Sequence, residues 1–188
     1  MKKMIALLAA CVLMLSGLPA FAKESGAETK RAEIRKTSQQ ILNQLYKTQP
    51  AARKAIAASA GYAVFSNFGM KIFVAGGGTG YGMAVDQATK KEVFMKMVEV
   101  QAGIGFGIKK FKLVFVFDNE KALDSFINSG WEGAAQATAA ATDGTNGAAY
   151  QGALSASPGV WLYQMTDKGL AAELTVKGTK YYKNDDLN

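Results

Sequence analysis

The sequence predicts an α+β fold in which N-terminal helices precede a strongly curved, mostly antiparallel, barrel-like β-sheet with one inserted helix. Two observations predict this fold. Apolar residues recur at helical spacing up to about residue 60, and they then alternate with a period of two over several short segments. The number of these segments, in a chain of 188 residues that is 49% hydrophobic, indicates one domain whose sheet curves strongly.

Residues 1–22 have the pattern of a secretory signal peptide. Two lysines precede an apolar run from Met4 to Leu18, and Ala20-Phe21-Ala22 places small residues at the positions that a signal peptidase reads. We expect cleavage after Ala22 and a periplasmic mature chain. The alternative is a lipoprotein, because Leu8-Ala9-Ala10-Cys11 resembles a bacterial lipobox whose Cys11 would carry the lipid anchor.

The first part of the mature chain, residues 23–37, is predicted as a polar leader and the start of an amphipathic helix. The leader covers Lys23–Ala27, and the helix covers Glu28–Lys47. One apolar stripe follows the helix, and basic residues occupy the opposite face. The stripe contains Ile34, Ile41, Leu42 and Leu45, and the basic residues are Lys30, Arg31, Arg35 and Lys36.

Pro50 ends this helix and is expected at the first position of a second, alanine-rich helix over Ala51–Ala60. Asp118 is expected to cap a later helix over Asn119–Asn128, which Gly130 ends. Strands are predicted at Tyr62–Phe65, Lys71–Ala75, Thr79–Val85, Glu92–Ile108, Phe111–Phe117, Val160–Met165, Leu170–Val176 and Lys180–Lys183. Asp185 and Asp186 are interpreted as part of a solvated tail.

Glycine recurs at every second position in two of the predicted strands. Glycine weakens a strand, so its repetition indicates either close packing and curvature or a ligand that approaches the bare backbone. We favour close packing, because neither stretch matches a phosphate-binding glycine motif. The first stripe contains Gly76, Gly78, Gly80 and Gly82, and the second contains Gly103, Gly105 and Gly107.

The composition argues against most enzyme classes and against metal sites or cofactors. The chain has no histidine and one cysteine, so histidine-based catalysis and histidine metal ligands are excluded and no internal disulfide forms. The net charge is +7, and removal of residues 1–22 with their two lysines leaves (22 − 2) − 15 = +5. A positive charge outside the cytoplasm favours anionic phospholipid over nucleic acid as the partner.

A basic cluster on the predicted strands is a second candidate for lipid contact. Lys109, Lys110 and Lys112 lie at the end of a strand, where lysines are most often simply solvated. The alternative is that they form a rim that binds lipid headgroups.

The chain from Ser38 to Asn188 resembles the SYLF domain family, a lipid-binding module. Gly61–Phe65 resembles the family's G-x-A-V-F entry strand, and the two glycine stripes resemble its glycine-rich strands. Phe111–Phe117 with the helix after it is similar to the family's strand-helix step, and Lys168-Gly169-Leu170 is similar to its closing strands. The resemblance implies a domain over residues 38–188 that binds lipid and offers no catalytic residues.

The sequence therefore predicts a non-enzymatic phospholipid-binding protein of the bacterial periplasm or cell envelope, without a cofactor. The alternative is an envelope scaffold that binds a protein partner through its N-terminal helix. The residues expected at the lipid site are Lys30, Arg31, Arg35, Lys36, Lys109, Lys110 and Lys112.

Overall fold

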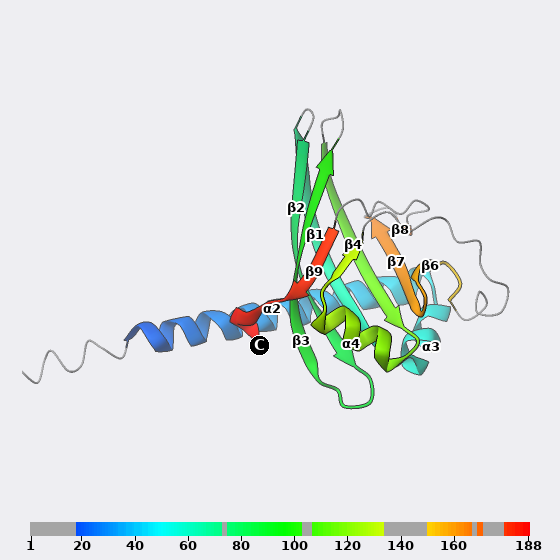
Figure 1. Ribbon diagram of the computed structural model, residues 1–188, viewed down its shortest axis with the longest axis horizontal. Coiled ribbons are helices and arrows are strands. Elements are labelled where there is room, and N and C mark those ends of the chain that lie inside the picture. The colour runs from blue at the N-terminus through cyan, green and yellow to red at the C-terminus, as the bar shows by residue number, and fades with distance from the viewer. Residues whose placement is uncertain (1–17, 73–74, 103–106, 134–149, 167–168, 171–178) are drawn as a thin grey trace, which may run out of the picture.

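The computed structural model describes residues 18–72, 75–102, 107–133, 150–166, 169–170 and 179–188 (Figure 1). The helices are α2 (Leu18–Thr48), α3 (Ala51–Ala58) and α4 (Glu120–Asn128), with a 3-10 turn η1 (Asp185–Leu187). The strands are β1 (Gly61–Ile72), β2 (Ala75–Asp86), β3 (Glu92–Ala102), β4 (Gly107–Phe117), β5 (Trp131–Gly133), β6 (Leu154–Ser157), β7 (Val160–Thr166), β8 (Gly169–Leu170) and β9 (Thr179–Lys183).

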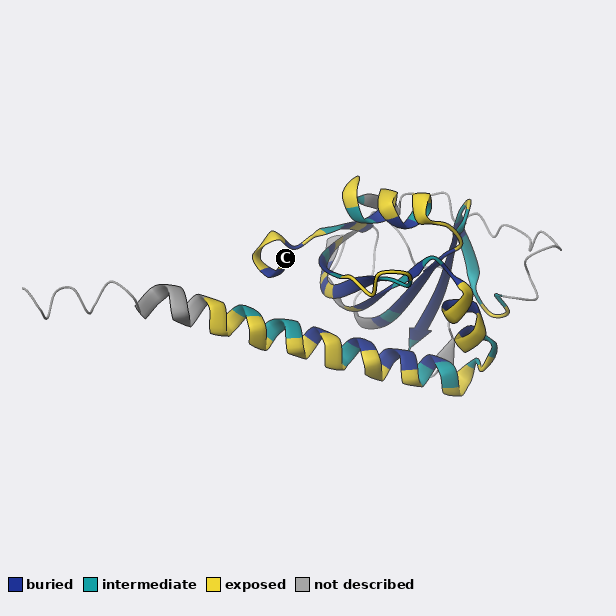
Figure 2. Cartoon of the chain, turned by 90° about the horizontal axis from the view of Figure 1, so that it is seen from below, coloured by how far each residue is buried: buried dark blue, intermediate teal, exposed yellow. Residues whose placement is uncertain are grey.

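The described strands form one sheet in the order β5-β9-β3-β2-β1-β4-β7-β6, and β8 pairs with β7. Every described pair is antiparallel. Figure 2 shows the sheet curling into a half-barrel, with α4 on its concave side and α2 along its convex side. We call these two sides the inner face and the outer face. The predicted α+β class with a curved antiparallel sheet is confirmed.

The inner face is filled by a core of aromatic side chains. Phe65, Phe115 and Tyr181 are fully buried, and the Phe65 and Phe115 rings lie 4.9 and 5.1 Å from that of Tyr181. Phe126 of α4 adds a further ring, 5.2 Å from Phe115. Rings at such separations pack edge to face or tilted, which favours dense filling of the core. The helix α4 therefore closes the half-barrel on this side.

The outer face is covered by α2 and α3. The apolar stripe of α2 lies against the sheet, with Ile41, Leu42 and Leu45 buried beside Val64 and Val114. Closer to the N-terminus, Ile34 packs with Met83, Val85, Phe94 and Leu187 in a second cluster. The helix α3 joins the first cluster through Ala52 and Ile56.

Several predicted boundaries are wrong. The helix α2 begins at Leu18, so Lys23–Ala27 is helical and not a leader, and α3 ends at Ala58. Pro50 is the N-cap residue of α3 and not its first helical residue. In α4 the cap is Asn119 and not Asp118, because Asn119 Oδ1 accepts from the backbone N–H of Ala122 at 2.9 Å.

Two strand predictions are also wrong. The segment Lys71–Ala75 is divided between the end of β1 and the start of β2, and Glu92–Ile108 is divided between β3 and β4. An alternating pattern does not show where one strand ends and an antiparallel neighbour begins, because both strands carry the same period. The predicted strand Leu170–Val176 lies outside the described residues after Leu170.

The C-terminal segment is docked on the fold, whereas the side chains of Asp185 and Asp186 are exposed, as the sequence predicts. Leu187 is buried in the outer-face cluster, and the exposed Asp186 pairs with Lys96 at 3.1 Å. The turn η1 therefore packs beside the N-terminal half of α2.

Candidate functional site

Arg31 and Arg35, expected at a lipid site, form contacts within the protein. Arg31 Nε donates to the backbone oxygen of Leu187 at 2.9 Å, and Arg35 Nε donates to Glu92 Oε2 at 2.7 Å. Both guanidinium groups also bond Glu28, at 3.0 and 3.2 Å, and they hold the pKa of its carboxyl below its usual value. These two arginines attach α2 to η1 and to β3.

Lys30 and Lys36 differ in their surroundings. Lys30 Nζ lies 2.9 Å from Glu33 Oε2 and 4.6 Å from the ring centre of Tyr81. Lys36 is exposed on the outward side of α2, where the other exposed residues are acidic, basic and uncharged. This outward strip contains Thr29, Glu33, Lys36, Gln40, Asn43 and Lys47, so it is not a continuous basic face.

Of the three lysines of β4, Lys112 has a described side chain. It is partly buried on the outer face, where its Nζ donates to Gln44 Oε1 of α2 at 2.9 Å. The backbone places Lys110 and Lys109 near the start of β4, and their side chains lie outside the described part of the structure. Their register partners on β1 are Phe68 and Gly69.

The first glycine stripe lies on β2, with its bare side toward the inner face. A Cβ atom built on Gly80 would lie 2.6 Å from Met97 Cγ and 2.6 Å from the backbone oxygen of Ser66, and one on Gly82 would meet Val64 O and the Phe65 ring. At these two positions neighbouring side chains and backbone occupy the space that a larger residue needs. Gly76 and Gly78 lie on the same strand, Gly107 begins β4, and Gly103 and Gly105 lie outside the described residues.

The outer face also carries a patch that the sequence analysis did not identify. Tyr81 and Val98 are large apolar side chains that are 43% and 37% exposed. Tyr81 lies opposite Lys96 in the β2–β3 register, and Val98 lies opposite Lys180 in the β3–β9 register. We call Tyr81, Val98, Lys30, Lys96 and Lys180 the outer-face patch. The alternating sequence pattern predicts that Tyr81 and Val98 lie on this face. It does not predict that they are exposed, because their exposure depends on where α2 crosses the sheet.

Two open pockets flank the sheet. One, of about 490 Å³, lies beside α4 and has a mixed lining that includes Asp86, Lys91, Val93, Lys121 and Asp124. The other, of about 150 Å³, lies where α2 crosses the sheet and includes Lys30, Ile34, Ser66 and Tyr81. Within the described residues, no group of three or more His, Cys, Asp or Glu side chains is arranged to hold a metal ion.

A partly exposed polar cluster lies just before α4. The carboxylate of Asp118 accepts hydrogen bonds from Tyr150 OH and from Trp161 Nε1, the latter at 2.9 Å. The two rings stack with centroids 4.6 Å apart. Burial and the neighbouring carboxylate both raise the pKa of Tyr150, so its hydroxyl stays protonated at neutral pH.

None of the described helices has a segment that is both long enough and apolar enough to cross a bilayer.

Comparisons with known proteins give two matches. Residues 98–188 match a family model described as "Ysc84: Las17-binding protein actin regulator". The chain is also 29% identical over 165 residues to "Beta cell expansion factor A" of Aeromonas veronii, an alignment that covers 86% of this chain. It covers 60% of that relative, so the chain spans well under the relative's full length.

Proposed function

We propose that the chain is a member of the Ysc84 (SYLF) family, which is linked to lipid binding, and that it is a non-enzymatic phospholipid-binding protein of the bacterial periplasm or cell envelope. The family is a binding module rather than a catalytic family. The excess of 22 Lys and Arg over 15 Asp and Glu favours an anionic membrane as the partner.

The inner face of the sheet is filled by side chains, and this observation supports the proposal that lipid is bound at a bilayer surface and not inside the fold. A protein that carries a lipid molecule needs an apolar cavity for its acyl chains. Among the described residues, the concave side of the sheet is instead occupied by fully buried side chains, including Phe65, Phe115 and Tyr181. The two pockets that flank the sheet are open to solvent and partly polar.

Vesicle co-sedimentation tests this function. We expect the protein to sediment with vesicles of phosphatidylglycerol and phosphatidylcholine at low salt, and much less with phosphatidylcholine alone. Raising the ionic strength should weaken binding, because salt screens attraction between lysines and anionic headgroups. The purified protein should not retain lipid in a one-to-one ratio. Absence of binding to both kinds of vesicle would contradict the proposal.

Location in the periplasm is part of the proposal and rests on residues 1–22. Cleavage after Ala22 would shorten α2, but the buried residues of its stripe begin at Ile34, so the docked part of the helix would remain. Mass spectrometry of the protein from a periplasmic fraction should find Lys23 as the first residue. A diacylated N-terminus at Cys11 would instead support the lipoprotein alternative.

The alternative function, an envelope scaffold that binds a partner through the N-terminal helix, receives no support from the position of α2. Its apolar stripe is already buried against the sheet, so a partner groove would have to displace the helix from Val64 and Val114.

A further inference from the structure

We propose that the outer face carries a binding site for one pyranose ring of a saccharide, in the pocket where α2 crosses the sheet. The inference goes beyond the proposed phospholipid binding and does not depend on it. It rests on three hydroxyl groups that form no hydrogen bond with the described residues, and on the exposed ring of Tyr81 beside them.

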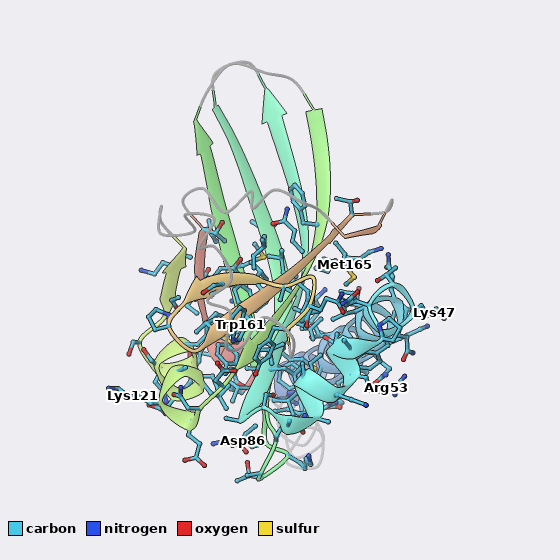
Figure 3. All side chains as sticks on the ribbon, turned by 90° about the vertical axis from the view of Figure 1, so that its right-hand side faces the viewer. Lys47, Arg53, Asp86, Lys121, Trp161 and Met165 are labelled. Carbon is cyan, nitrogen blue, oxygen red and sulfur yellow. The ribbon has the colours of Figure 1, made fainter. Side chains whose placement is uncertain are left out.

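The pocket lies where the cover provided by α2 ends. The strands β1–β4 continue well beyond the helices that cover the sheet (Figures 1 and 3). Toward the base of the sheet, Met83 and Phe94 are buried together with Ile34 of α2. Two residues earlier on β2, Tyr81 of the outer-face patch is 43% exposed. The pocket lies at this step, because the buried Ile34 and the exposed Tyr81 both belong to its lining.

Three hydroxyl side chains line this pocket from two elements. Thr37 and Ser38 belong to α2, and Ser66 belongs to β1, where it lies opposite Tyr81 in the register. Ser38 is buried, with 6% of its surface exposed, whereas Ser66 is exposed. None of the three hydroxyls forms a hydrogen bond with another described residue.

Other hydroxyls of α2 are bonded within the helix. Thr29 Oγ1 donates to the backbone oxygen of Ser25 at 2.8 Å, and Thr48 Oγ1 makes the same kind of bond at 3.1 Å. A bond to the carbonyl four residues earlier is a common arrangement for serine and threonine in a helix. Within the described part of the chain, Thr37 and Ser38 make no such bond, so their donors and acceptors are left for an occupant of the pocket.

The charges beside the pocket favour a neutral ligand. Lys30 Nζ and Glu33 Oε2, which both belong to the lining, lie 2.9 Å apart. An anion would have to approach the carboxylate, and a cation would have to approach the ammonium group. A neutral ligand rich in hydroxyl groups can instead donate to Glu33 and accept from Lys30.

The hydroxyls and the aromatic ring together indicate a sugar. A ligand that enters an open pocket displaces water, so it must replace the hydrogen bonds that water makes there. An apolar ligand would leave the buried Ser38 hydroxyl unsatisfied, whereas each hydroxyl of a sugar is both a donor and an acceptor. One face of a pyranose ring presents C–H groups, which pack on an aromatic ring such as that of Tyr81. The pocket volume of about 150 Å³ lies below the range typical of drug-sized ligands, so one ring fills it.

NMR titration of the isotope-labelled full chain tests the site. The probes are glucose, galactose, mannose and N-acetylglucosamine, each added to millimolar concentration. We expect the backbone amides of Ser38, Ser66 and Tyr81 to shift with at least one of these sugars. The amide of Ser125, an exposed residue of α4 on the other side of the sheet, should not shift.

The variant Ser38→Ala separates a ligand contact from a structural role. It should weaken sugar binding about fivefold, the value expected for the loss of one hydrogen bond. It should not lower the melting temperature of the free protein, because its hydroxyl has no partner to lose among the described residues. Ser25→Ala is the same substitution at an exposed position of the same helix, and it should bind sugar as the wild type does.

Substitution of Tyr81 provides the second arm. Tyr81→Ala should weaken sugar binding about fivefold or more, because the ring that packs on the sugar is lost, whereas Tyr81→Phe should retain binding. Its melting temperature should stay near that of the wild type, because Tyr81 is exposed. The control is Val98→Ala, since Val98 is exposed on the same face and does not belong to the described lining of the pocket.

The sugar ring can belong to a free saccharide or to the headgroup of a glycolipid, and vesicles distinguish the two sources. Vesicles of phosphatidylcholine with a glucosyl diacylglycerol are compared with vesicles of phosphatidylcholine alone. Sedimentation with the glycolipid vesicles that is lost in Tyr81→Ala would assign the site to a headgroup. Amide shifts with soluble sugars, without such sedimentation, would assign it to a free saccharide.

Other results would overturn the proposal. The site is wrong if no sugar shifts the three amides and glycolipid vesicles are not preferred. If inorganic phosphate shifts these amides and the sugars do not, the pocket binds anions instead. A lower melting temperature of Ser38→Ala with unchanged sugar binding would show that the hydroxyl stabilises the fold. Each of these results leaves binding to phosphatidylglycerol vesicles unaffected, so the proposed function is tested separately.

Discussion

The side chain of Asn188 forms two hydrogen bonds with the backbone of Phe94 in strand β3. Phe94 N donates to Asn188 Oδ1 at 2.9 Å, and Asn188 Nδ2 donates to Phe94 O at 2.8 Å. The backbone N–H of Asn184 also donates to Phe94 O, at 2.9 Å. At this position the C-terminal segment takes the place of a neighbouring strand and satisfies polar groups of β3 that β2 does not reach.

The first prediction concerns this contact. Asn188→Ala should lower the free energy of unfolding by about 1–3 kcal/mol, because partly buried backbone groups of Phe94 lose their partner. Thermal denaturation followed by circular dichroism measures the change. Asp185→Ala is the control, since Asp185 is exposed in the same turn. Equal melting temperatures for Asn188→Ala and the control would show that the hydrogen bonds of the Asn188 side chain do not stabilise the fold.

The second prediction uses two glycines with opposite surroundings. Gly82→Ala should destabilise the protein by about 1–3 kcal/mol, because the new methyl group would overlap Val64 O and the Phe65 ring. Gly26→Ala should instead stabilise it by about 0.5–1 kcal/mol, since Gly26 lies within α2 and nothing lies within 4 Å of its added Cβ. Urea denaturation of both variants measures the two signs. If Gly82→Ala is as stable as the wild type or more stable, the close approach at β2 is refuted.

The third prediction concerns Tyr163, a fully buried side chain whose hydroxyl has no hydrogen-bond partner among the described residues. Tyr163→Phe should raise the free energy of unfolding at pH 7 by about 1 kcal/mol, because it removes an unsatisfied buried polar group. A lower stability would instead reveal a partner for the hydroxyl.

The same tyrosine should make stability fall in alkali. Burial raises the pKa of Tyr163 from its ordinary value of 10.0 to about 12. The folded state therefore keeps this proton where the unfolded state loses it, so the contribution is fully present below pH 10.0 and is lost as pH rises toward 12. The decrease in melting temperature between pH 8 and pH 11 should be smaller for Tyr163→Phe than for the wild type. An identical fall in both would contradict the assignment.

The fourth prediction concerns acid. Arg31 and Arg35 lower the pKa of Glu28 below its ordinary value of 4.5, so its stabilising contribution is present above pH 4.5 and is lost as pH falls through the lowered pKa. Hydrogen exchange should show faster opening of the N-terminal half of α2 in acid. Glu28→Gln should already open faster at pH 7, and the exposed Glu24→Gln should exchange as the wild type does.

Long periodic segments were predicted from the sequence, and short pieces were not. Alternation identified β7 and β9, and an apolar stripe identified α2 and α4. The strand β5 has three residues and exists because Trp131 pairs with Tyr181, far along the chain. Three residues carry no period, so such a strand depends on tertiary contacts that no local pattern contains.

The contacts of the candidate site residues could not be predicted from the sequence, for the same reason. The spacing of Arg31 and Arg35 on one helix suggested a solvated basic face, but Arg35 pairs with Glu92 of β3 and Arg31 donates to the backbone oxygen of Leu187. The spacing of residues along one helix does not indicate which residues of distant segments they pair with. The exposure of Tyr81 and Val98 likewise depends on where α2 crosses the sheet, which is a property of the assembled fold.

The pairing of β3 with β9 has a consequence for synthesis of the chain. Met95 pairs with Lys183, so one edge of β3 has no partner until β9 has been synthesised. The other edge of β3 can pair with β2 as soon as β3 itself is made. Contacts between distant segments form slowly, and an open strand edge templates pairing with other chains. A chain truncated before Thr179 would therefore leave this edge of β3 unpaired. Such a chain should aggregate more readily than the full-length chain.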